Sequence, residues 1–198
     1  MSFMDDHTLW THVELLNTRD EVFNAYTDFE VWVKTQFRVR SFKRLQTDCG
    51  GEYLSHKFNQ HLAANGTKRI LTTHNTPMYN GVAERLNCVL LEHTWAFLHS
   101  STLPKFLWGE AVKHAVWLKN RMATHALLNR KTPYKMLYGK KPNLAGLREW
   151  GMKVRVHDAS GMKLDGRSRI GRWIGFEEAS NAHQIFWLDN HCHSGVKY

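Results

Sequence analysis

Short segments with the periodicity of a strand alternate with longer segments with the periodicity of a helix up to residue 121. Polar and apolar residues alternate over 9–15, which is the pattern of a half-buried strand. Apolar residues then recur at helical spacing from Val22 to Phe37, behind a Thr-x-x-Glu sequence at 18–21 that predicts a capping box. This order of elements is typical of layered α/β folds.

The same alternation continues further along the chain. We expect short strands at 41–47 and 68–72, with a helix at 53–64 between them. Apolar residues at helical spacing from Val82 to Phe97 predict a long amphipathic helix, and a further helix is expected over 104–121.

The pattern changes after Asn129, where basic residues, prolines and glycines interrupt the periodicity. We interpret 127–147 as a basic linker between a core at 1–126, which includes a helical extension, and a small β module at 148–198. Alternating and aromatic-rich segments in that module predict three short strands, at 153–157, 172–176 and 184–188.

The composition limits the classes of protein to consider. The 198 residues include 27 Lys and Arg against 18 Asp and Glu, a formal net charge of +9, and 42% are hydrophobic. A chain of this kind can bury a core, so its basic charge belongs to a folded surface and favours a polyanionic partner. No uninterrupted apolar run reaches about 18 residues, so we expect no membrane span.

The N-terminal residues and the cysteines favour an intracellular protein. Residues 1–6 are acidic, unlike a secretory or transit peptide, and the three cysteines have no paired spacing. The sequence His191-Cys192-His193 could bind a metal ion, but no second ligand pair lies at zinc spacing. An ordinary polar turn is the alternative.

Two carboxylates stand where a metal site could form. Asp48 ends the strand expected at 41–47 and precedes Gly50-Gly51, so it belongs at the carboxyl edge of a sheet. Glu84 lies near the start of the long helix. Oxygen ligands from two elements suit Mg²⁺ or Mn²⁺, and a pair of such ions promotes phosphodiester chemistry. The spacing alone leaves open a structural role, with Asp48 in a turn and Glu84 favoured by the helix dipole.

The sequences around Asp48 and Glu84 resemble the two signature blocks of retroviral-type integrases, and most closely those of copia-type (Ty1/copia-like) retrotransposon polyproteins. The first block is LQTDCGGEY at 45–53 and the second is NGVAERLN at 80–87. Later segments resemble further blocks of that family in the same order: 103–104, 108–111, 120–121, 132–134, 139–142 and 163–168. The resemblance therefore covers almost the whole chain.

The resemblance implies an α/β fold, with an RNase H-like mixed sheet and flanking helices over 1–126 and a small all-β SH3-like module over 148–198. It implies an integrase core, a polynucleotidyl transferase whose Asp-Asp-Glu triad holds Mg²⁺ or Mn²⁺ for 3′-end processing and strand transfer of DNA. By motif position, Asp48 is the second acid and Glu84 is the third.

The same resemblance implies the partners. They are DNA, both element ends and target, with RNA as a further candidate, and other copies of the chain, since integrases act as multimers. The implied location is the nucleus, after a cytoplasmic assembly stage. Asn80 and Asn87 match polar positions that the family places near DNA, and Arg85, Lys68 and Arg69 are basic candidates for the same surface.

The chain departs from the family pattern in three places. The first acid of the family lies before the block that residues 3–7 resemble, so we expect an N-terminally truncated core that is short of one metal ligand. Asp5 or Asp6 could substitute for it, with a strand-end or turn role as the alternative. Cys49 stands in place of an asparagine, and Cys88 in place of a basic residue that faces DNA.

These departures leave other functions open. A catalytically inactive DNA- or RNA-binding relic of a transposable element is the main alternative, and a ribonuclease H-like nuclease acting alone is a third. Trp150, Trp173 and Trp187 could stack on bases or could form a core. Basic residues in the linker and module could neutralise phosphates or be merely solvated: Lys131, Lys135, Lys140, Lys141, Lys163, Arg167, Arg169 and Arg172.

Overall fold

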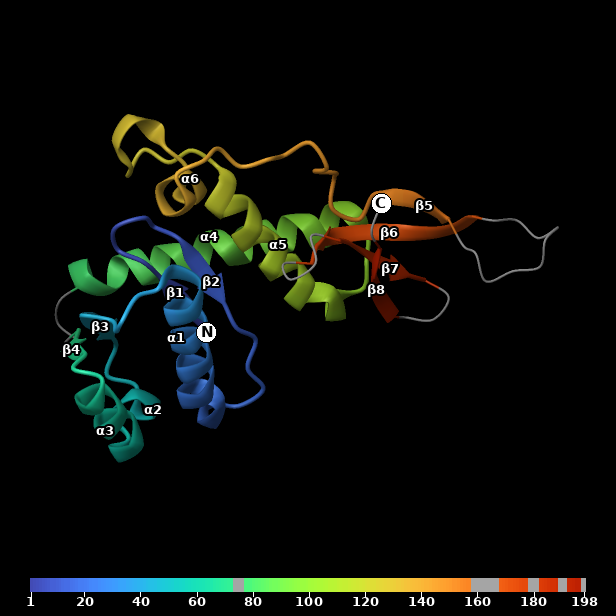
Figure 1. Ribbon diagram of the computed structural model, residues 1–198. Helices are drawn as coiled ribbons and strands as arrows, with labels where there is room; N and C mark the ends of the chain where they lie inside the picture. The colour runs from blue at the N-terminus through green and yellow to red at the C-terminus, as the bar shows by residue number, and fades with distance from the viewer. Residues whose placement is uncertain (73–76, 158–167, 178–181, 189–191, 197–198) are drawn as a thin grey trace. The chain divides into compact units, whose positions relative to one another are not determined.

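The computed structural model describes residues 1–72, 77–157, 168–177, 182–188 and 192–196, without the side chains of 77–80, 192–194 and 196. Contacts divide the chain into two compact units. The first unit comprises residues 1–2 and 14–88, and the second comprises 3–13 and 89–198. Figure 1 shows the elements of both units. The predicted metal candidate His191 and the family block at 163–168, except for Ser168, lie outside the described residues.

Helix α1 (Val22–Phe37) of the first unit confirms the predicted amphipathic helix. The predicted capping box is wrong, because a 3₁₀ turn, η1 (Arg19–Glu21), precedes α1 and the Thr18 side chain makes no capping hydrogen bond. The Glu21 carboxylate instead accepts a hydrogen bond from the backbone N–H of Asn17 at 3.0 Å. Glu21 therefore binds the backbone that precedes the 3₁₀ turn instead of capping the helix.

An aromatic core holds α1 against the following helices. Tyr26 of α1 is 1% exposed, and its ring centroid lies 4.9 Å from that of Phe58, which is fully buried. The helix predicted at 53–64 is in fact two helices, α2 (Gly51–Leu54) and α3 (His56–Ala64). Ser55 separates them, and its hydroxyl caps α3 by accepting a hydrogen bond from the N–H of Phe58 at 3.3 Å.

Two short parallel strands complete the first unit. Strand β3 (Arg44–Thr47) pairs with β4 (Lys68–Leu71), with Thr47 opposite Leu71. Both strands lie inside the ranges predicted for them. Figure 1 shows the two strands, β3 and β4. Because they are parallel, their carboxyl ends meet at one edge, and Asp48 directly follows Thr47 there.

Helix α4 (Pro77–Ser101) contributes residues to both units. Its buried stripe consists of Leu86, Leu90, Thr94 and Leu98, each one turn after the last. Val82 lies on the same stripe but is 56% exposed, so the predicted buried face begins later than expected. No helix in the described ranges combines the length and the apolar character that crossing a lipid bilayer requires.

The second unit joins a hairpin to helix α5 (Trp108–Arg121), which follows the 3₁₀ turn η2 (Lys105–Leu107). The hairpin consists of β1 (Ser2–Met4) and β2 (Thr11–Val13). In place of the single mixed sheet that was predicted, the described residues of the core form two separate pairs, β1 with β2 antiparallel and β3 with β4 parallel. The α/β fold class is confirmed.

The predicted linker contains regular structure. A 3₁₀ turn, η3 (Leu128–Arg130), precedes α6 (Pro133–Tyr138), which Thr132 caps by accepting a hydrogen bond from the N–H of Lys135. The compact units do not follow the boundaries predicted at 126 and 147, because residues 89–198 group with 3–13. Those domain boundaries stay a prediction.

A four-stranded antiparallel sheet ends the chain, with its strands in sequence order. Its strands are β5 (Lys153–His157), β6 (Ser168–Phe176), β7 (His183–Trp187) and β8 (Cys192–Val196). The sequence patterns did not predict β8. Trp150, Ile174 and Phe186 pack with Leu107 and Ala111 into a core between this sheet and α5 (Figure 1).

Candidate metal and nucleic-acid site

Asp48 lies in the turn between β3 and α2, as the sequence predicted for a strand-end acid. Its side chain is exposed, and its Oδ1 accepts a hydrogen bond from the backbone N–H of Gly50 at 3.1 Å. The Gly50 carbonyl in turn accepts a hydrogen bond from the N–H of Tyr53 at 3.1 Å. The carboxylate is thus part of a defined turn and still faces solvent.

A second carboxylate, from Glu52, lies over the same turn. A Cβ atom at Gly50 would come within 2.9 Å of the Glu52 carboxylate, so the absence of a side chain at position 50 gives that carboxylate room. Burial, together with the negative charges of Asp48 and Glu52, raises the pKa of Tyr53 to about 12. The turn is therefore a region of negative potential beside a neutral phenol, which favours a cation.

Glu84 lies further inside its helix than the sequence indicated. Helix α4 begins at Pro77, so Glu84 is about two turns from the N-terminus, where the helix dipole has little effect. The position of Glu84 in α4 therefore gives little support to the structural role considered for it, that of an N-terminal acid favoured by the helix dipole. Its side chain is exposed, and it belongs to the same compact unit as Asp48.

The predicted nucleic-acid residues differ in their surroundings. Lys68 and Arg85 are exposed, whereas Arg69 is half-buried and its Nη1 donates a hydrogen bond to the Tyr53 carbonyl. Asn87 is exposed, and its Oδ1 accepts a hydrogen bond from the Ser2 hydroxyl at 3.1 Å. Asn80 lies in α4, and its side chain is outside the description. All five residues belong to the first unit.

Neither Asp5 nor Asp6, in the hairpin, is clearly placed to substitute for the first acid of the triad. Asp5 has the turn role given as the alternative, since its Oδ2 accepts hydrogen bonds from the N–H and hydroxyl of Thr8 at 2.8 and 2.6 Å. Asp6 is exposed in the same turn. Within the described residues, no group of three or more His, Cys, Asp and Glu side chains is arranged to hold a metal ion.

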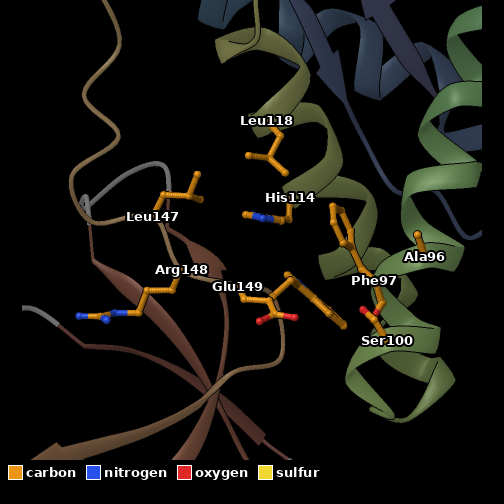
Figure 2. Close-up of a pocket in the computed structure, with 9 residues that line it drawn as sticks. Ala96, Phe97, Ser100, His114, Leu118, Leu147, Arg148 and Glu149 are labelled. Atoms are coloured by element: carbon orange, nitrogen blue, oxygen red, sulfur yellow. The ribbon is translucent and has the colours of Figure 1, made fainter.

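The second unit has a hollow of about 370 Å³ that sequence reasoning missed. Figure 2 shows His114 and Leu118 of α5 on one side of it and Leu147 and Arg148 on the other. His114 is 4% exposed, and burial lowers its pKa to about 4, so its ring is neutral at pH 7. Apolar and aromatic side chains dominate the lining, and the acids of the candidate metal site are not among them.

The tryptophans considered for base stacking form the core instead. Trp150, Trp173 and Trp187 are 3%, 1% and 8% exposed, so their faces are not available to bases. Two of the basic candidates are also engaged within the protein: Arg169 lies over the Trp187 ring, and Arg172 donates a hydrogen bond to the Gly151 carbonyl at 2.9 Å. Lys140 and Lys141 are exposed.

No family model matches the chain, but individual proteins do. It is 31% identical over 188 residues to the Retrovirus-related Pol polyprotein from transposon TNT 1-94 of Nicotiana tabacum, which covers 94% of the chain and 14% of that polyprotein. It is 28% identical over 190 residues to the polyprotein from transposon RE1 of Arabidopsis thaliana, covering 94% of the chain and 13% of that protein. The Gag-Pol polyprotein of transposon Ty1-DR6 from Saccharomyces cerevisiae is 32% identical over 126 residues, 63% of the chain and 7% of the polyprotein. The chain thus spans less than one sixth of the length of these relatives.

Two solved structures share the fold. The HTLV-2 integrase catalytic core domain in complex with magnesium has a TM-score of 0.52 and 18% identity, covering 69% of the chain and 82% of that structure. A chain of the simian T-cell lymphotropic virus intasome in complex with the PP2A regulatory subunit B56 gamma has a TM-score of 0.55 and 17% identity, covering 100% of the chain and 69% of its own. The chain is a homologue of a segment of the Pol polyproteins of Ty1/copia-type retrotransposons, and it has the fold of a retroviral integrase catalytic core.

Proposed function

We propose that this chain is the core of a retrotransposon integrase and that, in the intact polyprotein, it takes part in 3′-end processing and strand transfer of DNA. The observation that carries the proposal is the position of Asp48, in the motif LQTDCGGEY, at the carboxyl edge of a parallel strand pair in an integrase-core fold. The homology over 94% of the chain supports it. The relatives are much longer, so the activity of the whole protein belongs to this proposal.

Asp48 and Glu84 are proposed as ligands of Mg²⁺ or Mn²⁺. Both are exposed carboxylates in the first unit, and carboxylate oxygens are the ligands that these ions prefer. The negative potential around Asp48, Glu52 and Tyr53 also fits a cation. When bound, such ions supply the positive charge that stabilises attacking and leaving oxygens at a phosphodiester. The magnesium in the HTLV-2 core supports the choice of ion.

DNA is the proposed partner, and the surface of the first unit is the proposed contact. Lys68 and Arg85 are exposed there and can neutralise phosphates, while Asn87 can donate hydrogen bonds from its amide. Arg69 is proposed to act mainly through its bond to the Tyr53 carbonyl. Self-association and a nuclear site of action, after cytoplasmic assembly, are further parts of the proposal.

The test is a nicking and joining assay of the intact polyprotein on labelled double-stranded DNA ends with Mg²⁺ or Mn²⁺. We expect a metal-dependent product that disappears in Asp48→Asn and in Glu84→Gln, because each change removes a charged metal ligand. Glu92→Gln is the matched control, since Glu92 is an exposed acid on the same helix and should leave the product unchanged. A product that survives both ligand changes contradicts the assignment of the metal site.

A DNA- or RNA-binding relic without catalysis is the second candidate. It is favoured by Cys88, which is exposed where the resembled family carries a basic residue. A relic is expected to bind nucleic acid with an affinity that falls steeply as salt rises, and to give no metal-dependent product. Binding measured by fluorescence anisotropy at several salt concentrations, beside the nicking assay, separates the two functions.

A further inference from the structure

Hydrogen bonds from Thr72 connect the carboxyl ends of β3 and β4, in addition to the hydrogen bonds between the two strands. Thr72 directly follows β4, and both its backbone N–H and its hydroxyl donate hydrogen bonds to the Thr47 carbonyl, at 3.1 and 3.2 Å. Thr47 is the residue before Asp48. One carbonyl thus receives two hydrogen bonds from the same residue, and Thr72 is 6% exposed, so water does not compete strongly for these bonds.

Cys49, the residue after Asp48, is also hydrogen-bonded to Thr72. The Cys49 thiol, on a half-buried side chain, donates a hydrogen bond to the Thr72 carbonyl at 3.3 Å. Asp48 therefore lies between two residues that are each bonded to Thr72, one through its carbonyl and one through its side chain. Among the residues that the structure describes, the Asp48 side chain accepts a hydrogen bond only from the N–H of Gly50, within its own turn. Its direction accordingly depends on how the backbone of 47–50 is held.

We propose that Thr72 and Cys49 are positioning residues for Asp48: together they fix the backbone on both sides of this acid and so the direction of its carboxylate. The inference rests on the proposed function in that Asp48 is taken as a metal ligand. A carboxamide can donate a hydrogen bond to a carbonyl, as the Cys49 thiol does, so Cys49→Asn is expected to keep the positioning.

The opposite end of the strand pair offers a matched control. Thr67, directly before β4, is also 6% exposed, and its hydroxyl donates a hydrogen bond to the Phe42 carbonyl at 2.8 Å. Thr67→Val and Thr72→Val remove the same kind of bond from equally buried residues. They should lower the midpoint of thermal unfolding to a similar degree, but only Thr72→Val should disturb Asp48.

The experiment follows the Gly50 amide resonance by ¹⁵N-edited NMR as the pH is lowered. Because this N–H donates to the Asp48 carboxylate, its shift reports both the ionisation and the placement of that group. We expect the amplitude of the shift to fall about twofold or more in Thr72→Val and in Cys49→Ala, since hydrogen bonds weaken steeply on misalignment. Thr72→Ser, Cys49→Ser and Thr67→Val should keep the amplitude of the unmodified chain.

An unchanged amplitude in Thr72→Val and Cys49→Ala, or an equal loss in Thr67→Val, would overturn the proposal. Cys49→Ala removes only a thiol from a half-buried position, so it remains informative if Thr72→Val does not fold. Adding Mn²⁺ and following the broadening of the Gly50 resonance tests the proposed function separately. If Mn²⁺ does not broaden the Gly50 resonance but the shift amplitudes are as expected, metal binding at Asp48 is contradicted and the positioning role is still supported.

Discussion

His114 shows how strongly burial can change the chemistry of a single residue in this protein. Its ring stacks on Trp117 with an interplanar angle of 9° and meets Trp173 edge-on at 5.3 Å between centroids. Its Nδ1 is buried and has no hydrogen-bond partner within the described residues. Such surroundings disfavour the charged imidazolium, and burial accordingly lowers the pKa of His114 from 6.5 to about 4.

The free energy of unfolding is expected to decrease as the pH is lowered, because of His114. Between pH 6.5 and 4 the unfolded chain takes up a proton at this residue that the folded chain does not, so acid favours unfolding, by about 1.4 kcal/mol for each pH unit in that window. His114→Phe should therefore unfold with a weaker pH dependence between pH 7 and pH 5, as measured by chemical denaturation at each pH. His7→Phe changes an exposed histidine of the same unit and serves as the control. An unaltered slope in His114→Phe would contradict this account.

The candidate site shows what the sequence can predict about single residues. Asp48 was predictable because it directly follows a strand pattern and lies two residues before a pair of glycines, an order that depends on local sequence alone. The hydrogen bond from Arg69 to the Tyr53 carbonyl was not predictable. It requires β4 to pair with β3 and α2 to begin at Gly51, and both depend on the tertiary fold. The role of Thr72 depends on the same strand register and leaves no mark in the sequence.

Helix α5 and strand β2 illustrate how one element is fixed to another by side chains. Asn120 of α5 is 2% exposed, and its amide binds the backbone of Thr11 twice: Oδ1 accepts from the N–H at 2.9 Å, and Nδ2 donates to the carbonyl at 2.7 Å. Lys119 donates hydrogen bonds to the Leu9 carbonyl and the Thr11 hydroxyl, and burial lowers its pKa to about 8. The side chains of α5 thus replace a neighbouring strand for β2.

Asn120→Asp is expected to destabilise the second unit. The new carboxylate still accepts from the Thr11 N–H, but its other oxygen faces the Thr11 carbonyl and cannot donate to it. Losing this buried hydrogen bond and burying a charge should lower the free energy of unfolding by about 2–3 kcal/mol at neutral pH. Asn143→Asp is the control, because Asn143 is exposed and its Oδ1 only accepts, from the N–H of Ala145. Equal stability of the two variants, measured by urea unfolding, would refute the role given to Asn120.

Elements with strong local periodicity were predictable, and those that depend on a partner were not. Helix α1 repeats apolar residues at helical spacing, so its existence followed from the sequence. The break at Ser55 between α2 and α3 was missed, because serine ends one helix and caps the next without changing the apolar pattern. Strand β8 was missed because the segment from Cys192 to Val196 has little strand character of its own and pairs with β7.

At the scale of the whole molecule, the charge and the candidate groups agree with the proposed role in DNA integration. The 198 residues have a formal net charge of +9, and the proposed metal ligands and DNA contacts all belong to the first unit. The second unit supplies a packed sheet and a hollow lined mainly by apolar groups, with no part in the proposed chemistry. The central claim therefore depends on Asp48 and Glu84 binding a divalent ion.

Calorimetric titration of the 198-residue chain with Mn²⁺ tests that claim most directly, because it measures binding without requiring catalysis. The account predicts binding whose affinity falls about tenfold or more in Asp48→Asn and in Glu84→Gln, and which Glu92→Gln leaves unchanged. Binding of equal affinity in the unmodified chain and both ligand variants, or no binding at all, would contradict the assignment of Asp48 and Glu84 as metal ligands.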